Sequence, residues 1–498
     1  MRLGHLAEGV AGAAVQAGAR VDVRAVVHDS RSAGPGDLFV AVRGLRADGH
    51  DFAAAAAARG AAVAVERPVP LPAGTAWLRL ADTRLGLAEL SAELHGRPAR
   101  RLRVVGVTGT AGKSTTTHLV ASALEAAGLP AGYLSSVALR STGPPADNES
   151  GQTTLEPPQV QAWLARMVAG GAAAAVLEVS SHALEQGRVA ACDFDVAAFT
   201  NVREDHLEYH GSPEAYLRAK ARLIELCASG SAKGGLKTAV LNRDDTSFED
   251  LEAYPIQRRL TYGMAGAPDV RAAALRPVRG GTAFVLHAGD ASVEVRLQLP
   301  GRFNVANAAC AAACGLALGL PLDRLALGLT AFPGLRGRLE RVDLGQPFTL
   351  YVDFAHSAVA LASVLGELRR DTDGRLLAVF GASSRSGGHD PAGMGRAAAA
   401  MADFFVITTD DPLDVDPAEL ARQVVAGASG REPGRDYEVE LDRRAAIRRA
   451  LALARRGDVV LLAGKGHERT LDLAGGPVPW DERAEAEAGL RALSLARI

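Results

Sequence analysis

The sequence predicts an α/β protein of three domains, with a central doubly wound parallel sheet of the P-loop type. Three observations predict this fold. Strand-like apolar runs alternate with helical patterns along most of the chain, as they do in parallel sheets. The length of 498 residues suits about three domains of roughly 150 residues each. A glycine-rich segment ending in Lys113-Ser114 lies between an apolar strand and a helix.

Residues 1–98 are expected to form a small N-terminal α/β domain. Short apolar runs predict strands at 23–27, 37–42, 62–65 and 77–80. Helices are expected at 52–59, which is rich in alanine, and at about 84–95. The second helix runs into a Gly-Arg-Pro segment at 96–98, where we place the domain boundary.

Residues 99–333 are expected to form the central domain. Its parallel strands are predicted at 103–105, 175–179 and 196–200. Shorter alternating runs over 270–299 predict a small antiparallel excursion. A long Ala-rich helix at about 304–319 and the segment Phe332-Pro333-Gly334 close the domain.

Residues 334–498 are expected to form a Rossmann-like C-terminal domain. Apolar runs predict strands at 349–353, 376–380, 404–408 and 459–463. The helical patterns between them imply a second nucleotide-binding type of α/β fold. No repeat of about 20–50 residues is present in the sequence.

Residues 106–115, which read GVTGTAGKST, have the composition of a phosphate-binding loop. Backbone N–H groups between a strand and a helix can close around phosphate oxygens. Lys113 would add a point charge on the outer phosphates, and the Ser114 hydroxyl would be a Mg²⁺ ligand. The standard P-loop has a glycine five residues before the glycine that precedes the lysine. Here that position is Val107, and the glycines stand at 106 and 109. The predicted nucleotide contacts in this loop are Gly109, Thr110, Gly112, Lys113, Ser114 and Thr115.

The use of lysine supports this interpretation. Only five of the 55 basic residues are lysines, namely Lys113, Lys220, Lys233, Lys237 and Lys465. Lysines kept in such an arginine-rich chain are candidates for chemistry that a guanidinium cannot perform. Lys233 and Lys237 lie in a Gly-rich stretch and are expected at the surface.

Composition excludes several classes of protein. A hydrophobic content of 48%, a charged content of 22% and a net charge of −2 describe an ordinary globular protein without a basic nucleic-acid surface. No apolar run of about 18 residues predicts a membrane span, and no secretory h-region is found at the N-terminus. The four cysteines lack zinc-type spacing, and Cys310 and Cys314 are expected to be buried thiols. We therefore expect a cytoplasmic protein, and a monomer.

Acidic residues follow two predicted strands. Glu178 ends one apolar run, at the strand end where a magnesium ligand is expected beside a phosphate-binding loop. The next strand leads into a cluster of acids and histidines at 204–210 that could hold a second cation. Lys220 lies in a helical pattern and by itself reads as an exposed lysine.

With these segments the chain resembles the Mur ligase family, and within it the type that adds the third residue to UDP-N-acetylmuramoyl-L-alanyl-D-glutamate (MurE type). The resemblance covers nearly the whole length. It rests on His28–Arg31, Pro35–Ala41, Asp48–Phe52, the loop at 109–114, Thr153-Thr154, Glu178–His182 with Gln186 and Arg188, Asp205–Gly211, Gly301–Asn307, Gly337-Arg338, Asp353–His356 and Ala463–Glu468.

The resemblance implies a UDP-binding N-terminal domain, an ATPase domain and a C-terminal domain that binds the incoming amino acid. It implies that ATP and Mg²⁺ activate a carboxylate as an acyl phosphate, which an amino group then attacks. Lys113, Lys220 and His206 would be catalytic, with Lys220 carbamylated. Magnesium would be held by Ser114, Glu178, His206 and the carbamylated Lys220. Other contacts implied are Asn304, Arg338 and Asp353 for ATP, Ser30 and Arg31 for the uridine diphosphate, and Thr153, Thr154, Ser180, Gln186 and Arg188 for the muramoyl dipeptide.

The C-terminal third departs from the family pattern. Where a DNPR-like sequence is usual, this chain reads DDPLDVD at 410–416. In diaminopimelate enzymes the arginine there pairs with a substrate carboxylate, which Leu413 cannot do. Four aspartates in seven residues suit a substrate ending in an ammonium group. We therefore expect L-lysine or L-ornithine, bound by residues that include Asp410, Asp411, Asp414, Gly464 and Glu468.

Other departures leave alternatives open. The family's aromatic-Ala-His-Thr-Pro-Asp run reads FAHSAV at 354–359, Ala111 replaces a common polar residue, and Arg385 stands in a different register from the usual arginine. The alternatives are the same reaction with meso-diaminopimelate and a MurE-like ligase acting on another carboxylate outside cell-wall synthesis. A paralogue that binds UDP-sugar or ATP without ligation is disfavoured by intact Lys113, Glu178, His206 and Lys220. Folylpolyglutamate synthase shares the central design but not the N-terminal segments.

Overall fold

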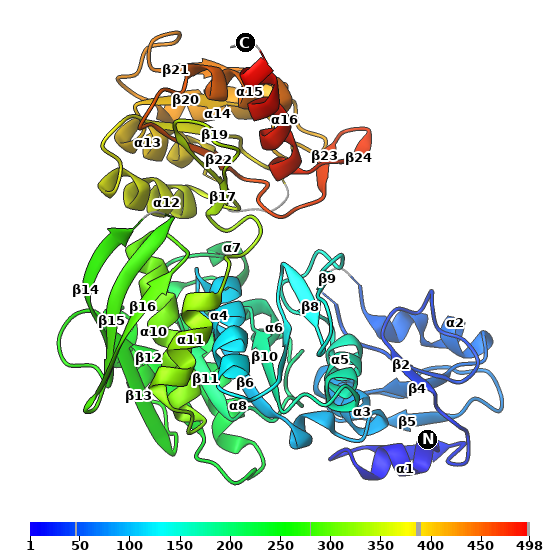
Figure 1. Cartoon of the computed structure of the whole chain (residues 1–498). Coiled ribbons are helices and arrows are strands. Elements are labelled where there is room, and N and C mark those ends of the chain that lie inside the picture. The colour runs from blue at the N-terminus through cyan, green and yellow to red at the C-terminus, as the bar shows by residue number, and fades with distance from the viewer. Residues whose placement is uncertain (45–46, 279, 385–389, 496–498) are drawn as a thin grey trace.

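The computed structural model describes residues 1–44, 47–278, 280–384 and 390–495; Arg385 therefore lies outside the described residues. These residues form three α/β units around sheets of five, eleven and six strands, with a separate two-stranded ribbon. The six-stranded unit lies above the eleven-stranded unit in Figure 1, and the five-stranded unit lies beside the latter. The predicted fold class is confirmed.

The N-terminal unit is a five-stranded sheet in the order β1-β5-β4-β3-β2. Its elements are α1 (Leu3–Glu8), β1 (Ala14–Ala17), β2 (Ala25–Val27), β3 (Asp37–Val40), η1 (Gly49–Phe52), α2 (Ala53–Ala58), β4 (Ala62–Val65), β5 (Trp77–Arg79) and α3 (Thr83–Leu94). Strands β2 to β5 are parallel neighbours, and β1 joins β5 antiparallel at the edge. The four predicted strands are all present.

The central unit carries the phosphate-binding loop. Its elements are η2 (Pro98–Arg101), β6 (Arg103–Thr108), α4 (Lys113–Ala126), β7 (Ala131–Leu134), β8 (Ala138–Arg140), β9 (Ala146–Asp147), α5 (Pro157–Ala169), β10 (Ala174–Glu178), α6 (Ser181–Glu185), β11 (Val196–Phe199), α7 (Leu207–His210), α8 (Pro213–Ser229), β12 (Thr238–Asn242), α9 (Phe248–Glu252), β13 (Arg258–Gly263), β14 (Val270–Val278), β15 (Gly281–Ala288), β16 (Ala291–Leu297), α10 (Arg302–Ala317) and α11 (Leu322–Ala331).

Strand β6 lies between β10 and β11 in a parallel array that also includes β7, β12 and β13. Val105 and Val107 face α4, α10 and α11, whereas Val104 faces α5 and α8 on the other side. A strand covered on both faces reads as a continuous apolar run. Strands β14, β15 and β16 form the expected antiparallel extension.

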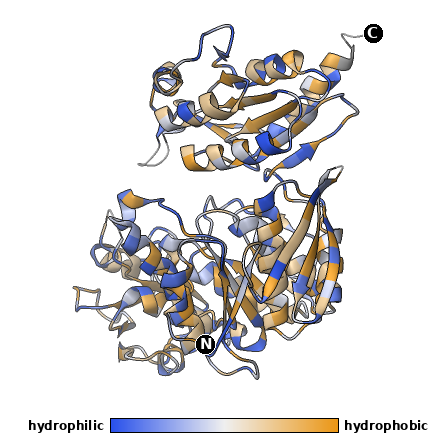
Figure 2. Ribbon diagram, turned by 90° about the vertical axis from the view of Figure 1, so that its left-hand side faces the viewer, coloured by the Kyte–Doolittle hydropathy of each residue, from blue (hydrophilic) through white to orange (hydrophobic). Residues whose placement is uncertain are grey.

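The C-terminal unit is a mostly parallel sheet in the order β17-β18-β22-β19-β20-β21. Its elements are β17 (Glu340–Val342), β18 (Thr349–Asp353), α12 (Ala358–Arg370), β19 (Leu376–Phe380), α13 (Pro391–Met401), β20 (Phe404–Ile407), α14 (Pro417–Gly427), β21 (Tyr437–Val439), α15 (Arg443–Leu453), β22 (Val459–Ala463), β23 (Thr470–Leu473), β24 (Gly476–Pro479) and α16 (Glu482–Leu495). Figure 2 shows the hydrophobic strands of this unit between helices on both sides.

The expectation that Lys233 and Lys237 lie at the surface is wrong. Lys233 Nζ lies 2.7 Å from a carboxylate oxygen of Asp195 and also donates to the carbonyl oxygens of Ala99, Leu102 and Asp193. Lys237 Nζ lies 3.1 Å from the other Asp195 oxygen. A compact ammonium fits a cage of oxygens that a planar guanidinium would not, which explains lysine at both positions.

The cysteines and the helices bear on two further expectations. Cys310 and Cys314 are buried free thiols, as predicted. None of the helices in the described ranges combines the length and apolar character needed to cross a bilayer.

Candidate active site

The phosphate-binding loop joins the end of β6 to the start of α4. Gly109 has a φ of 149° and Gly112 a φ of 83°, values that favour glycine. A Cβ on Gly109 would lie 1.9 Å from Thr200 Oγ1. Thr200 donates to the Ala111 carbonyl at 2.6 Å, and the Asn201 side chain makes two bonds of 3.1 Å to the Ala111 backbone. The end of β11 thus holds the loop in shape.

Two lysines converge on one carbonyl oxygen of this loop. Lys113 Nζ donates to the Gly109 oxygen at 3.0 Å and to the Thr110 oxygen at 2.9 Å. Lys220, from α8, donates to the same Gly109 oxygen at 2.7 Å, and its Nζ lies 4.3 Å from the centroid of the Tyr216 ring. The Thr110 hydroxyl is 3.2 Å from the Tyr216 hydroxyl.

Lys220 is only 1% exposed, so it is not the exposed lysine that its helix alone suggests. Burial, followed by the positive charge of Lys113, lowers the pKa of Lys220 well below its usual range. Burial also lowers the pKa of Lys113. A lysine in this environment gives up its proton readily and becomes a nucleophilic amine.

The Ser114 hydroxyl and the Glu178 carboxylate meet beside the loop. Ser114 Oγ donates to Glu178 Oε1 at 3.0 Å, and the Ser136 N–H donates to Oε2 at 2.8 Å. Ser114 and Glu178 are both buried, and so is Thr115, which follows in the first turn of α4. Hydroxyl and carboxylate oxygens are ligands that Mg²⁺ prefers, so this donor set fits that ion.

His206 does not join this pair in the structure. It precedes α7 with a φ of 52°, and its ring nitrogens lie 3.7 Å from Asp205 Oδ2 and 3.5 Å from Glu208 Oε1. No hydrogen bond or ion pair among the described residues links it to Ser114 or Glu178. The described ranges also contain no group of three His, Cys, Asp or Glu side chains arranged for a metal, and the second cation site at 204–210 stays a prediction.

The N-terminus of α10 lies against the loop. A Cβ on Gly112 would be 2.5 Å from Asn307 Oδ1. The Asn307 amide donates to Asn304 Oδ1 at 3.2 Å, and the Asn304 amide donates to the Pro300 carbonyl at 2.8 Å. The predicted adenine contact Asn304 is therefore held next to the nucleotide loop. Sequence reasoning assigned no role to Asn307, although its i+3 spacing from Asn304 places both on one helix face.

Arg338 and Asp353 belong to the C-terminal unit and approach the same place. Arg338 Nη2 lies 3.4 Å from Ser114 Oγ, and its guanidinium lies 4.7 Å from the centroid of the Phe354 ring. Asp353 accepts hydrogen bonds from the N–H groups of Leu339, at 2.7 Å, and Ala355, at 2.8 Å. Burial raises its pKa. Asp353 thus shapes the segment that carries Arg338.

Most residues predicted to bind the muramoyl dipeptide lie together next to Glu178. The Ser180 N–H donates to Thr154 Oγ1 at 3.0 Å, and Arg188 Nη1 donates to the Thr154 carbonyl at 2.9 Å. Gln186 Oε1 accepts from Arg188 at 2.7 Å. Arg188 also pairs with Glu156 at 3.1 Å. Thr153 is half-buried, next to Thr154 in the chain.

Ser30 and Arg31 lie in a turn after β2. The Arg31 side chain is 89% exposed and pairs with Asp29 at 2.7 Å, which holds the pKa of that carboxyl at about 2. The Ser30 carbonyl accepts a hydrogen bond from Arg59. Asp29 orients a guanidinium that remains open to an anionic ligand.

The aspartates at 410–416 mostly have partners within the chain. Lys465 Nζ lies 2.8 Å from Asp411 Oδ1, 4.0 Å from Asp410 Oδ1 and 2.5 Å from Glu468 Oε2. Burial raises the pKa of Asp410 to about 7, although Arg443 and Lys465 oppose the shift. Asp410 and Asp411 thus already face a cation of the chain itself, and their contact with a substrate stays a prediction.

The remaining residues of this segment differ from one another. Asp416 accepts from the Ala418 N–H at 3.0 Å and caps α14, whereas Asp414 is exposed. Leu413 has a φ of 51°. A Cβ on Gly464, which has a φ of 114°, would lie 2.2 Å from Asp410 Oδ2, so glycine leaves room for that carboxylate.

Sequence reasoning also missed a buried ion pair behind this segment. Arg443 Nη2 lies 2.7 Å from Glu482 Oε1, and neither side chain is accessible to solvent. Arg443 donates to the carbonyl of Thr409, two residues after β20, and to that of Ala463, the last residue of β22. No local pattern marks the pair, because its partners are far apart in the sequence.

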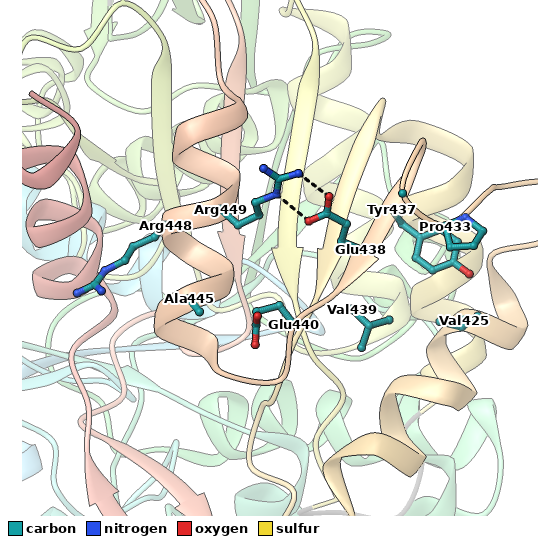
Figure 3. Close-up of a pocket in the computed structure, with 10 residues that line it drawn as sticks. Val425, Pro433, Tyr437, Glu438, Val439, Glu440, Ala445, Arg448 and Arg449 are labelled. Carbon is teal, nitrogen blue, oxygen red and sulfur yellow. Dashed lines mark hydrogen bonds and ion pairs between the residues drawn. The ribbon is translucent and has the colours of Figure 1, made fainter. Parts of the chain in front are cut away.

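An open pocket of about 950 Å³ lies elsewhere on the C-terminal unit, between β21, α14 and α15. Figure 3 shows Glu438 and Arg449 paired on its wall. No residue predicted for the active site lines this pocket.

Comparisons with known proteins agree with this architecture. Family models described as "Mur ligase family, catalytic domain", "Mur ligase middle domain" and "Mur ligase, glutamate ligase domain" match residues 22–76, 107–315 and 337–466. The chain is 42% identical over 488 residues to a UDP-N-acetylmuramyl-tripeptide synthetase of Roseiflexus, covering 95% of each chain.

Two further relatives are similar over nearly the full length. A UDP-N-acetylmuramoyl-L-alanyl-D-glutamate–2,6-diaminopimelate ligase of Geobacillus kaustophilus is 38% identical, covering 99% of both chains. A solved structure of a ligase with that name superimposes with a TM-score of 0.68 at 30% identity, covering 96% of each chain. The fold and its loop thus define an enzyme of the ligase class. The chain belongs to the Mur ligase family, and within that family it resembles the MurE type.

Proposed function

We propose that this enzyme uses ATP to form an amide bond between UDP-N-acetylmuramoyl-L-alanyl-D-glutamate and a free diamino acid, a step of peptidoglycan precursor synthesis. One observation carries the proposal. Ser114 and Glu178 are hydrogen-bonded at 3.0 Å beside a loop on which Lys113 and Lys220 converge. The names of the relatives supply the identity of the acceptor.

Ser114 and Glu178 would hold Mg²⁺. When bound, the ion would neutralise charge on the transferred phosphoryl group. Lys113 now donates to loop carbonyls, and it would turn to the phosphates when ATP enters. Arg338 would add a second positive charge from the C-terminal unit. His206 remains a predicted metal ligand, and that role requires a shift of the segment that carries it.

Lys220 would be carbamylated. Its neutral amine attacks carbon dioxide, a new N–C bond forms, and the amine proton leaves to solvent. The product is an anionic group with two oxygens in place of a buried cation. Arginine could not undergo this change, which accounts for a lysine at this position in an arginine-rich chain.

The reaction itself needs an activated carboxylate. An oxygen of the acceptor carboxylate attacks the γ-phosphorus of ATP and ADP leaves, giving an acyl phosphate. The amino group of the incoming residue then attacks the acyl carbon, and phosphate leaves as the amide forms. Thr154, Ser180 and Arg188, which lie next to Glu178, would position the acceptor, while Ser30 and Arg31 would bind its uridine diphosphate.

For the incoming residue we propose L-ornithine or L-lysine. Asp410 and Asp411 are paired with Lys465, so the choice of amino acid does not depend on them. It rests on Leu413, which offers no cation for a distal carboxylate, and on exposed Asp414, which makes no ion pair with any residue in the described ranges. Diaminopimelate is the second candidate, because the names of relatives at 38% identity favour it.

A substrate panel tests the proposal. The purified enzyme is incubated with ATP, Mg²⁺, the UDP-linked dipeptide and one of the three amino acids, and ADP and product mass are measured. We expect ADP formation only with both substrates present, and fastest with ornithine or lysine. A preference for diaminopimelate would overturn the choice of amino acid alone, whereas no ADP with any of them would overturn the ligase proposal.

A further inference from the structure

The first turn of α10 lacks a cap from its own unit. Gly301 precedes the helix with a φ of 94° and can offer no side chain. The first N–H groups of a helix have no partner within it. Here the N–H of Arg302 donates to a carboxylate oxygen of Glu367, which lies in α12 of the C-terminal unit. In Figure 1, α12 lies at the boundary with the central unit.

The fit between Glu367 and this turn is close. Glu367 is 8% exposed, and a Cβ on residue 301 would lie 2.8 Å from its Cγ. Glycine at 301 therefore leaves the space that the glutamate fills. The next residue, Phe303, packs against the hydrophobic core of the C-terminal unit. Two successive residues of α10 thus contact that unit.

The same turn contacts the nucleotide loop. Asn304 accepts a hydrogen bond from Asn307, and Asn307 lies against Gly112. From Arg302 to Asn307, one and a half turns of helix connect a carboxylate of the C-terminal unit with the loop of the central unit. An anionic group at a helix N-terminus stabilises the first turn.

We infer that Glu367 is a positioning residue of the nucleotide site. It caps α10 from across the domain boundary, and it orders Asn304 and Asn307 when the C-terminal unit is seated, that is, packed against the central unit. Nucleotide binding and the seating of that unit are then energetically linked. The inference rests on the proposed function only in taking ATP as the nucleotide.

The test compares three variants of the full-length enzyme. Glu367→Ala removes the cap, Glu367→Gln keeps an oxygen that can accept the Arg302 N–H, and Arg370→Ala removes the exposed partner of the other Glu367 oxygen, 3.4 Å away. Binding of a non-hydrolysable ATP analogue with Mg²⁺ is measured by calorimetry, without the acceptor. KM for ATP and for the amino acid is measured in turnover.

We expect Glu367→Ala to weaken analogue binding and raise KM for ATP by about threefold to thirtyfold, the range expected for a lost cap. KM for the amino acid should change little. Glu367→Gln should restore most of the loss, and Arg370→Ala should behave as the parent. Combining Glu367→Ala with Asn307→Ala should cost less than the sum of the two changes, because both act on one turn.

Parental ATP binding in Glu367→Ala would overturn the inference. So would an equal loss in Glu367→Ala and Glu367→Gln that affects both KM values and lowers the melting temperature, since that is the signature of a purely structural residue. A parent that binds no ATP analogue would overturn the proposed function and this inference together.

Discussion

The Lys220 ammonium group donates a 2.7 Å hydrogen bond to the carbonyl oxygen of Gly109, 111 positions away in the chain. A buried cation thus lies directly beneath the loop expected to hold the phosphates. Burial lowers the pKa of this lysine, which favours the unprotonated amine that carbamylation needs.

Replacing Lys220 by alanine should reduce turnover by about tenfold to a hundredfold, the scale seen when groups that orient a metal site are lost. Lys220→Arg should be equally impaired, because it keeps the charge but cannot form a carbamate. Short carboxylic acids such as acetate should partly restore Lys220→Ala. Arg218→Ala, an exposed position on the same helix, is the control and should retain parental kcat.

Glu178→Gln should raise the Mg²⁺ concentration needed for half-maximal activity by about tenfold or more. An amide keeps the shape of the side chain but loses the negative charge. Titration of activity with MgCl₂ measures the effect. Ser122→Ala is the matched control on α4, since its hydroxyl bonds the Gly328 carbonyl away from the loop. An unchanged magnesium requirement in Glu178→Gln would exclude it as a ligand.

The fold was largely predictable from the sequence. Strands at 349–353 and 459–463 have the predicted limits, because parallel strands buried on both faces read as continuous apolar runs. The loop at 106–115 was equally clear, since few other arrangements place Gly, Lys and Ser between a strand and a helix. Local pattern was sufficient for these features.

The burial of charged groups could not be predicted in this way. Lys220 is preceded by Arg218 and followed by Arg222, so its helix reads as polar there, and only the packing of α8 on the sheet buries it. Lys237 meets Asp195 42 positions away, and Lys465 meets Asp411 54 positions away. Such pairs depend on tertiary structure, and they overturned the surface assignment of Lys237.

Leu413→Arg should shift amino-acid preference towards diaminopimelate. A guanidinium at this position could pair with the distal carboxylate, and charged hydrogen bonds of that kind contribute about 1.5–3 kcal/mol. The ratio of kcat/KM for diaminopimelate to that for ornithine should rise about tenfold or more. Val415→Arg, at an exposed position two residues on, should leave the ratio unchanged. Equal ratios in both variants would show that residue 413 does not face the substrate.

Asp195→Asn should destabilise the central unit by about 3–5 kcal/mol, because it leaves the buried Lys233 and Lys237 without a carboxylate. Urea unfolding followed by circular dichroism measures the loss. The matched control Glu294→Gln weakens exposed pairs with Arg276 and Arg296 and should cost less than about 1 kcal/mol. A similar small effect of both changes would mean that the lysine cage adds little to stability.

The central claim is that ATP converts the acceptor's carboxylate into an acyl phosphate. The most direct measurement uses UDP-N-acetylmuramoyl-L-alanyl-D-glutamate carrying heavy oxygen in its terminal carboxylate, with mass analysis of the phosphate released during ligation. An acyl phosphate requires that one labelled oxygen pass to phosphate for each amide formed. Amide formation with unlabelled phosphate would contradict the account.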